Sequence, residues 1–471
     1  MKFWLGIALA LLALSQTSGS TVERIFKRLH EEPPLPTTQN RADEVQTLWI
    51  EQKLDHFNES ETRTWQMRYM LNDAHYKSGA PLFIYLGGEW EISPGRITGG
   101  HTYDMAVEHN ALLAYTEHRY YGQSRPLPDL SNENIKYLTV NQSLADLAHF
   151  ILTIKENYEG LSNSKVVIVG GSYSATMVTW FRRLYPDLVV GGWASSAPLF
   201  AKVNFVEYKE ITGQSITQMG GADCYKRIEN GIAEMETMIA TKRGAEVKAL
   251  LRLCEPFDVY SDLDVWTLFA YISDTFAGLV QTHSAGQIEG ACQKIMAGSD
   301  DLSGVAGYLL ESYGNARCYD FTYNFITGLM LDTSYNGNIM RQWTFQTCNE
   351  FGWYQTSGSS AQPFGTKFPL TYYTTMCVDL YGPQYGNEFI NNQVDTTNQY
   401  FGGLTPGVEN VYLSHGQLDP WRAMGIQDPD QATIIPEHAH CRDFESISSS
   451  DSAELKASKE RIAELVREWV K

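Results

Sequence analysis

A serine flanked by glycine lies where a predicted strand turns into a predicted helix. The β-branched run 165–169 is typical of a strand, residues 176–183 of a helix, and Gly170-Gly171-Ser172-Tyr173-Ser174 joins them. Such a turn requires small neighbours, and it raises the serine oxygen above the sheet with the next N–H aimed at an oxyanion. Ser172 is therefore the candidate nucleophile of a hydrolase. The motif departs from G-x-S-x-G because Ser174 replaces the last glycine, and a serine that only caps a helix is the alternative.

Strand and helix patterns alternate through the first part of the chain and return near its end. A helical spacing of apolar residues over 140–158 lies between two strand candidates, which makes βαβ units and a largely parallel sheet the natural arrangement. The sequence therefore predicts an α/β fold. The strand candidates are 65–70, 81–86, 111–115, 165–169, 189–193 and 410–413.

The pattern changes between residues 205 and 395, where longer helical candidates such as 227–253 and 266–280 carry cysteines. A mostly helical domain inserted into the α/β domain explains the change. The α/β domain would then consist of 45–204 and 396–471, ending in an amphipathic helix over 452–471 that packs back on the sheet.

The first residues have the layout of a secretory signal peptide. A basic start, an apolar run and small polar residues follow one another over 1–19, and the segment 20–44 lacks periodicity and is expected to be loose. No later apolar run predicts a membrane anchor, and no Lys-Asp-Glu-Leu retention signal ends the chain. We expect a secreted, vesicular or lysosomal protein, in which Asn58 and Asn141 would be exposed glycosylation sites.

Charge and cysteine content narrow the function classes. The formal net charge of −19 argues against nucleic-acid and anionic-membrane binding. All seven cysteines lie beyond residue 200, and six of them fall between 224 and 377, so one segment is expected to be disulfide-bonded. Cys441 stands apart as a buried free thiol, with an intermolecular bridge as the alternative.

An acid and a base follow late in the chain, as a serine nucleophile requires. Asp419 comes after the strand candidate 410–413, on the side of an open α/β sheet where active groups gather, although an Asp-Pro turn would explain it equally well. His440 lies in the following Pro436–Asp443 stretch and is the candidate base. The order Ser172, Asp419, His440 is that of α/β-hydrolases.

Other histidines are rivals for the role of base, namely His118, His415 and His438. No spacing of histidines or cysteines indicates a metal site, and no cofactor motif is present, so neither a metal nor a cofactor is expected. The oxyanion hole would use the N–H of Tyr173 and one from the Gly87-Gly88-Glu89 loop, for which Gly88 is the candidate.

Taken together, the motifs resemble the serine peptidase family of lysosomal prolyl carboxypeptidase, dipeptidyl peptidase II and thymus-specific serine protease. The resemblance covers nearly the whole mature chain and looks strongest to the thymus-specific branch, because a cysteine follows His440. It rests on Leu54–Phe57, Leu86–Glu89, Glu117–Ser124, Gly170–Tyr173, Trp180–Arg182, Ser195–Pro198, Gly416–Trp421 and Ala439-His440.

The resemblance implies an α/β-hydrolase fold with a mostly parallel sheet and an inserted, mainly helical, disulfide-bearing cap domain. It also implies a Ser-Asp-His triad that cleaves short peptides near a terminus, often after proline. Three disulfides follow from it: Cys224 with Cys292, Cys254 with Cys318, and Cys348 with Cys377.

The resemblance further places Glu89, Thr176, Met177 and Trp421 at the substrate. Thr176 stands about where prolyl-cleaving members have an apolar residue, which puts a post-proline preference in doubt. Trp421 would form an aromatic wall or simply pack in the core. Glu89 or Glu91 would bind an α-ammonium group.

We therefore expect a serine peptidase that releases N-terminal dipeptides, with peptides as its substrate. A prolyl-type carboxypeptidase, an esterase or a non-catalytic peptide binder on the same fold are the alternatives, and formation of a homodimer stays open.

Overall fold

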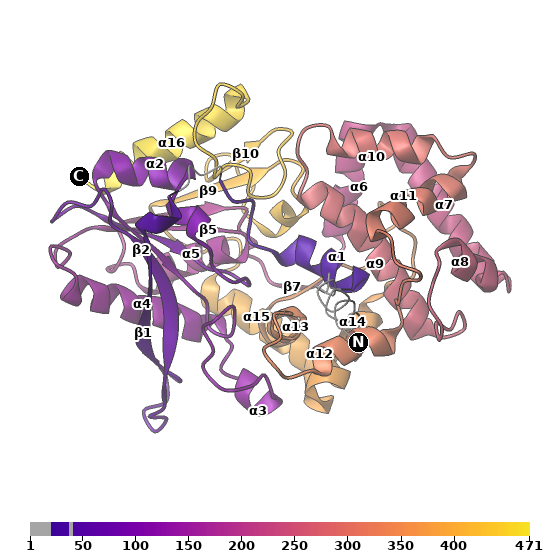
Figure 1. Cartoon of the computed structure of the whole chain (residues 1–471), viewed down its shortest axis with the longest axis horizontal. Coiled ribbons are helices and arrows are strands. Elements are labelled where there is room, and N and C mark those ends of the chain that lie inside the picture. The colour runs from indigo at the N-terminus through magenta and orange to yellow at the C-terminus, as the bar shows by residue number, and fades with distance from the viewer. Residues whose placement is uncertain (1–19, 37–40) are drawn as a thin grey trace, which may run out of the picture.

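The structure, a computed structural model, describes residues 20–36 and 41–471, so the predicted signal peptide 1–19 lies outside the described residues. Figure 1 shows two parts side by side: a twisted sheet with helices on both faces, and a bundle of helices. The first part is formed by both ends of the chain, and the bundle is the middle of the chain.

The main sheet has eight strands in the order β1-β2-β4-β3-β5-β6-β9-β10. The β1 and β2 strands run antiparallel, β2 is also antiparallel to β4, and all other neighbours are parallel. This is the mostly parallel sheet of an α/β-hydrolase. Its strands are β1 (Val45–Lys53), β2 (Thr64–Asn72), β3 (Leu82–Leu86), β4 (Leu112–Thr116), β5 (Val166–Gly171), β6 (Gly191–Ser195), β9 (Val411–Gly416) and β10 (Ala432–Ile435).

Helices cover both faces of this sheet because its parallel strands are apolar on both sides. One face packs on α4 (Val140–Asn157) and α5 (Tyr173–Leu184), the other on α2 (Gly100–His109) and α16 (Ala453–Trp469). The expected helices over 140–158 and 452–471 are thus present. Short elements on the loops are α3 (Asn132–Ile135), η1 (Ala42–Glu44), η2 (Pro94–Ile97) and η5 (Pro420–Met424).

The bundle has its own apolar core and a small parallel pair of strands, β7 (Lys202–Asn204) and β8 (Gly352–Tyr354). The single helix expected over 227–253 is two, because the chain breaks at Thr241 to Arg243. The helices are α6 (Glu207–Gly220), α7 (Ala222–Ala240), α8 (Gly244–Leu250), α9 (Asp262–Gln281), α10 (Gln287–Met296), α11 (Asp301–Tyr313), α12 (Tyr323–Leu331), α13 (Met340–Gln346), α14 (Leu370–Tyr381) and α15 (Asn387–Phe401), with η3 (Thr347–Phe351) and η4 (Pro383–Tyr385).

Helix α9 is the apolar centre of the bundle. By length and composition it is the one candidate membrane span among the described residues, yet 78% of its apolar window is buried inside the protein. Three disulfides link segments of the bundle: Cys224–Cys292, Cys254–Cys318 and Cys348–Cys377. These are the pairs that the family resemblance implies. Cys441 is free and buried.

The N-terminal segment differs from the expected loose chain. Helix α1 (Thr21–His30) begins with a capping box in which Ser20 and Glu23 satisfy each other's backbone N–H groups. It lies between the sheet and the bundle in Figure 1 and packs on α9. The apolar residues of α1 lie on one face of the helix. This amphipathic pattern is only about three turns long and is followed by prolines, which is why the sequence indicated a loose segment.

Of the two glycosylation candidates, Asn58 is exposed as expected. Asn141 is only half-buried rather than exposed, because it lies in the first turn of α4 and its side-chain carbonyl oxygen is buried.

Candidate active site

The turn between β5 and α5 has the geometry of a nucleophile elbow. Ser172 has φ 60° and ψ −132°, a combination that side-chain-bearing residues rarely adopt. A Cβ atom on Gly170 would lie 2.4 Å from the carbonyl oxygen of Ser174, so only glycine fits two positions before the serine. Ser174 is accommodated because its hydroxyl exchanges hydrogen bonds of 2.9 Å with the backbone of Gly171. The serine in the last glycine position thus helps to hold the elbow.

Asp419 and His440 are paired at the same edge of the sheet. Nδ1 of His440 lies 2.8 Å from Oδ2 of Asp419, and the other carboxylate oxygen accepts the backbone N–H of Trp421 at 3.0 Å. With a proton on Nδ1 donated to the aspartate, Nε2 is left as the basic nitrogen. That nitrogen is buried and has no hydrogen-bond partner among the described residues.

The pair is deeply buried, and its charges stabilise each other. Burial opposes the imidazolium, yet the Asp419 carboxylate raises the pKa of His440 well above its ordinary value. Burial would likewise raise the pKa of Asp419, but the charge and hydrogen bond of His440 hold it below the usual range. Asp419 is therefore a carboxylate suited to orient the imidazole.

Backbone contacts join the elbow to the histidine loop. The N–H of Ser172 donates to the carbonyl oxygen of Ser195 at 2.9 Å, and the thiol of Cys441 lies 3.6 Å from the same oxygen. The N–H of Cys441 donates to the hydroxyl of Ser196 at 3.0 Å. The end of β6 thus holds the candidate nucleophile and the residue after the candidate base together.

The rival histidines have other contacts. His118 hydrogen-bonds the hydroxyl of Tyr173 at 3.0 Å, and burial lowers its pKa to about 4. His415 is buried beneath Gly425, and burial lowers its pKa to about 4 as well. Nδ1 of His438 lies 2.6 Å from the carbonyl oxygen of Pro436. Among these four histidines, His440 is the one whose ring nitrogen is hydrogen-bonded to Asp419.

The oxyanion candidates lie at the expected turns. Tyr173 opens α5, so its N–H belongs to the first turn, whose donors have no acceptor within the helix. Gly88 follows β3 at the same edge of the sheet, and the preceding Gly87 is fixed by a hydrogen bond of 2.8 Å to Thr116. Glu89, the next residue, is buried with Oε1 3.7 Å from Nδ1 of His30.

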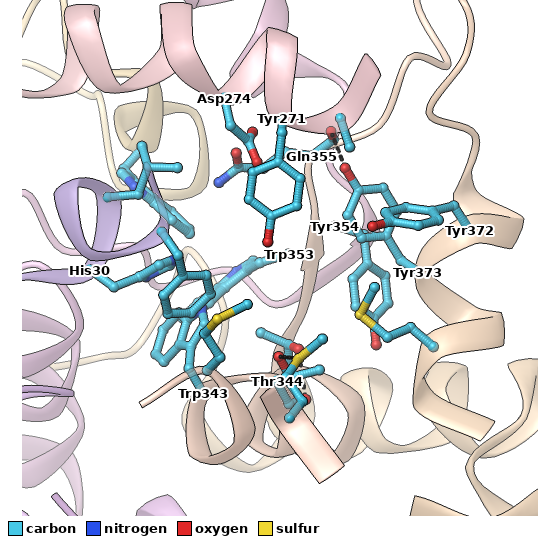
Figure 2. Close-up of a pocket in the computed structure, with 18 residues that line it drawn as sticks. His30, Tyr271, Asp274, Trp343, Thr344, Trp353, Tyr354, Gln355, Tyr372 and Tyr373 are labelled. Carbon is cyan, nitrogen blue, oxygen red and sulfur yellow. Dashed lines mark hydrogen bonds between the residues drawn. The ribbon is translucent and has the colours of Figure 1, made fainter. Parts of the chain in front are cut away.

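A cavity of about 130 Å³ lies among the bundle, α1 and the sheet (Figure 2). Aromatic side chains form a large part of its walls, and Trp421 is one of them. Thr176 and Met177 are buried and are not among the residues that line this cavity. The Thr176 hydroxyl donates inward to Pro198 at 2.9 Å, because this face of α5 packs on the sheet.

Sequence reasoning missed three further residues around the cavity: Asp274, Gln281 and Trp343. Gln281 accepts hydrogen bonds from Trp421 at 2.9 Å and Tyr208 at 2.6 Å, and its backbone oxygen accepts the N–H of His440 at 3.2 Å. After Asp264, Asp274 is the one charged residue and Gln281 the one amide residue in the remainder of α9, and that interruption was the available signal.

Comparisons with known proteins give the family of the chain. A family model described as serine carboxypeptidase S28 matches residues 52–462. The chain is 30% identical to "Putative serine protease K12H4.7" of Caenorhabditis elegans, over 100% of this chain and 99% of that protein. It is 30% identical to the mouse "Thymus-specific serine protease", over 90% and 87%, and 27% identical to the mouse "Lysosomal Pro-X carboxypeptidase", over 91% and 90%. The chain therefore belongs to the serine carboxypeptidase S28 family of peptidases.

Proposed function

We propose that this protein is a serine exopeptidase whose triad is Ser172, Asp419 and His440. The observation that carries the proposal is the hydrogen bond between His440 and Asp419, which leaves Nε2 without a partner, together with a serine held at a strained strand-to-helix turn. In apo structures the bond between base and nucleophile is often long and tightens with substrate, so its absence here is compatible with catalysis.

The reaction passes through an acyl-enzyme. Oγ of Ser172 attacks the scissile carbonyl carbon while Nε2 of His440 takes the hydroxyl proton, and the N–H groups of Tyr173 and Gly88 stabilise the oxyanion. Collapse breaks the C–N bond, and His440 returns the proton to the leaving amine. Water, deprotonated by His440, then attacks the ester carbonyl; as the C–O bond to Ser172 breaks, His440 returns that proton to Oγ and the acid product leaves.

We further propose that the enzyme releases N-terminal dipeptides after proline or a small residue. The small cavity, with its many aromatic side chains, supports recognition of a short end of a peptide. A prolyl-type carboxypeptidase is the second candidate, favoured by the name of the "Lysosomal Pro-X carboxypeptidase" relatives. The disulfides support a secreted or lysosomal location.

The test is peptide cleavage by the wild type and Ser172→Ala, with products read by mass spectrometry. Ser172→Ala should lower kcat by at least about 1,000-fold and abolish labelling by a fluorophosphonate. The exposed Ser162, just before β5, gives the control Ser162→Ala, which should behave as the wild type. Unchanged cleavage by Ser172→Ala would exclude this nucleophile.

The products decide between the alternatives. Loss of N-terminal dipeptides establishes a dipeptidyl peptidase, and loss of single C-terminal residues establishes a carboxypeptidase. Hydrolysis of a neutral ester without peptide cleavage would favour an esterase, and a folded protein that is neither labelled nor active would favour a peptide binder.

A further inference from the structure

Residues in the wall of the aromatic cavity contact the acid loop, the residue after the candidate nucleophile and the oxyanion loop. Trp421 in its wall donates its backbone N–H to Asp419, and the ring of Trp343 lies 5.7 Å from that of Tyr173, the residue after the nucleophile. His30, which also lines it, faces Glu89 of the oxyanion loop. A peptide bound at Ser172 would therefore extend one of its ends into this cavity.

Asp274 is the one carboxylate among the described residues that line the cavity. In Figure 2 it descends from helix α9 beside Tyr271, with His30 and Trp343 across from it. Its Oδ1 accepts a hydrogen bond of 2.7 Å from Nζ of Lys209, and its side chain is 22% exposed. An oxygen of this carboxylate is thus available to a ligand.

Lys209 contacts Asp274 but does not itself line the cavity. Its side chain is fully buried, and its ammonium group is covered by the rings of Tyr208 and Phe368, 5.3 Å and 5.9 Å from their centres. It is not among the lining residues, so the cavity presents the carboxylate and not the lysine. The ion pair fixes the position of Asp274, and a second cation can approach from the cavity side.

The rest of the lining suits a cation. The aromatic residues include Tyr271, Trp343, Trp353 and Tyr373, whose π-faces attract ammonium groups. Burial, with the Asp274 carboxylate, raises the pKa of Tyr373 well above its ordinary value, so its hydroxyl stays neutral. The described lining contains no lysine or arginine.

We propose that Asp274 is the specificity-determining residue that binds the free α-ammonium group of the peptide substrate in this aromatic cavity. The inference rests on the proposed exopeptidase function for its substrate class, and it assigns the terminus that the enzyme recognises. Glu91, one of the residues first considered for this role, is more than half exposed and paired with Arg68.

Measuring the binding of peptides tests this inference independently of the proposed catalytic mechanism. In a Ser172→Ala background, titration calorimetry with alanyl-alanine amide and its N-acetyl form measures recognition without turnover. The free amine should bind at least about 10-fold more tightly, because a charge-assisted hydrogen bond is worth about 10- to 100-fold in affinity. Equal affinity of the two probes, or no binding of either, overturns the inference.

The variant Asp274→Asn should remove that preference, and because it leaves Lys209 without its counter-charge, the double variant Lys209→Met/Asp274→Asn is measured beside it. Asp262→Asn is the matched control, since Asp262 is an exposed acid on the same helix and should keep the wild-type preference. A double variant that still prefers the free amine also overturns the inference.

Kinetic measurements distinguish failure of the proposed catalytic mechanism from failure of the proposed role of Asp274. If Ser172→Ala retains activity, the proposed mechanism fails while the binding result still decides the role of Asp274. If Ser172 is essential and Asp274→Asn leaves the ratio of kcat/KM for free and N-acetylated peptides unchanged, the enzyme is a peptidase in which Asp274 has no part in selection.

Discussion

At the scale of single residues, His440 sets the pH range of activity. The base must be neutral to accept the Ser172 proton, and the Asp419 carboxylate outweighs burial to raise the pKa of His440 above 6.5. We therefore expect the rate of fluorophosphonate labelling to rise with pH and to level off only above about pH 7. The profile is measured by stopping the labelling reaction at timed intervals at each pH between about 4 and 9 and quantifying the labelled protein.

The rival histidines make the profile informative. His118 and His415 have pKa values of about 4, lowered by burial, so either of them as base would give full labelling already at pH 5 to 6. A flat profile across that range would contradict the assignment of His440. Enzyme held at each pH and then assayed at neutral pH controls for acid unfolding.

The triad candidates could be predicted from sequence, but the cavity could not. Ser172, Asp419 and His440 each follow or adjoin a recognisable strand pattern, and their order is itself informative. Asp274 carries no such context, because its role depends on residues brought near it from α1, α13 and the 419–421 turn. For Thr176 and Met177 the resemblance gives a position along the chain but not the face of α5 on which each side chain lies.

At the scale of elements, Asp443 ties two strands to the histidine loop. It is buried, and its two carboxylate oxygens accept the hydroxyls of Ser195 at 2.5 Å and Ser414 at 2.6 Å. These serines are paired across β6 and β9. Asp443→Ala would leave both buried hydroxyls without this acceptor, and it should lower the free energy of unfolding by about 2–4 kcal/mol. Urea denaturation measures the change.

The control for Asp443 is a surface acid of the same C-terminal region. Glu468 is exposed on α16, and Glu468→Ala should change stability by no more than about 0.5 kcal/mol. A loss below about 1 kcal/mol for Asp443→Ala would mean that the carboxylate contributes little to joining the strands.

Elements with strong periodicity were predictable, and those defined by long-range contacts were not. The strands expected at 81–86 and 165–169 are β3 and β5, since continuous apolar runs bounded by turns are typical of parallel strands. Helix α1 was missed because its partners are distant in sequence: the side chain of Gln281 donates to the carbonyl oxygen of Leu29 at 2.7 Å. Its side chains complete the cavity wall from a segment expected to be loose.

At the scale of the whole molecule, the three disulfides stabilise only the helical bundle, and the sheet has none among the described residues. The bundle has a separate apolar core and supplies Asp274 and Trp343 to the cavity, so its stability would govern the proposed recognition, while the sheet holds the proposed triad. Removing Cys224–Cys292, which closes a loop of 68 residues, should cost about 4 kcal/mol by the loss of chain restriction in the unfolded state.

The loss of stability on removing this disulfide should be confined to the bundle and should not extend to the sheet. In the variant Cys224→Ala/Cys292→Ala, amide hydrogen exchange should accelerate in α9 and stay near the wild-type rate in β5. The variant Cys348→Ala/Cys377→Ala is the comparison: its loop of 29 residues predicts a loss about 0.8 kcal/mol smaller. Equal acceleration in α9 and β5 would show that both parts unfold as one unit, and the cavity would then be no less stable than the triad beneath it.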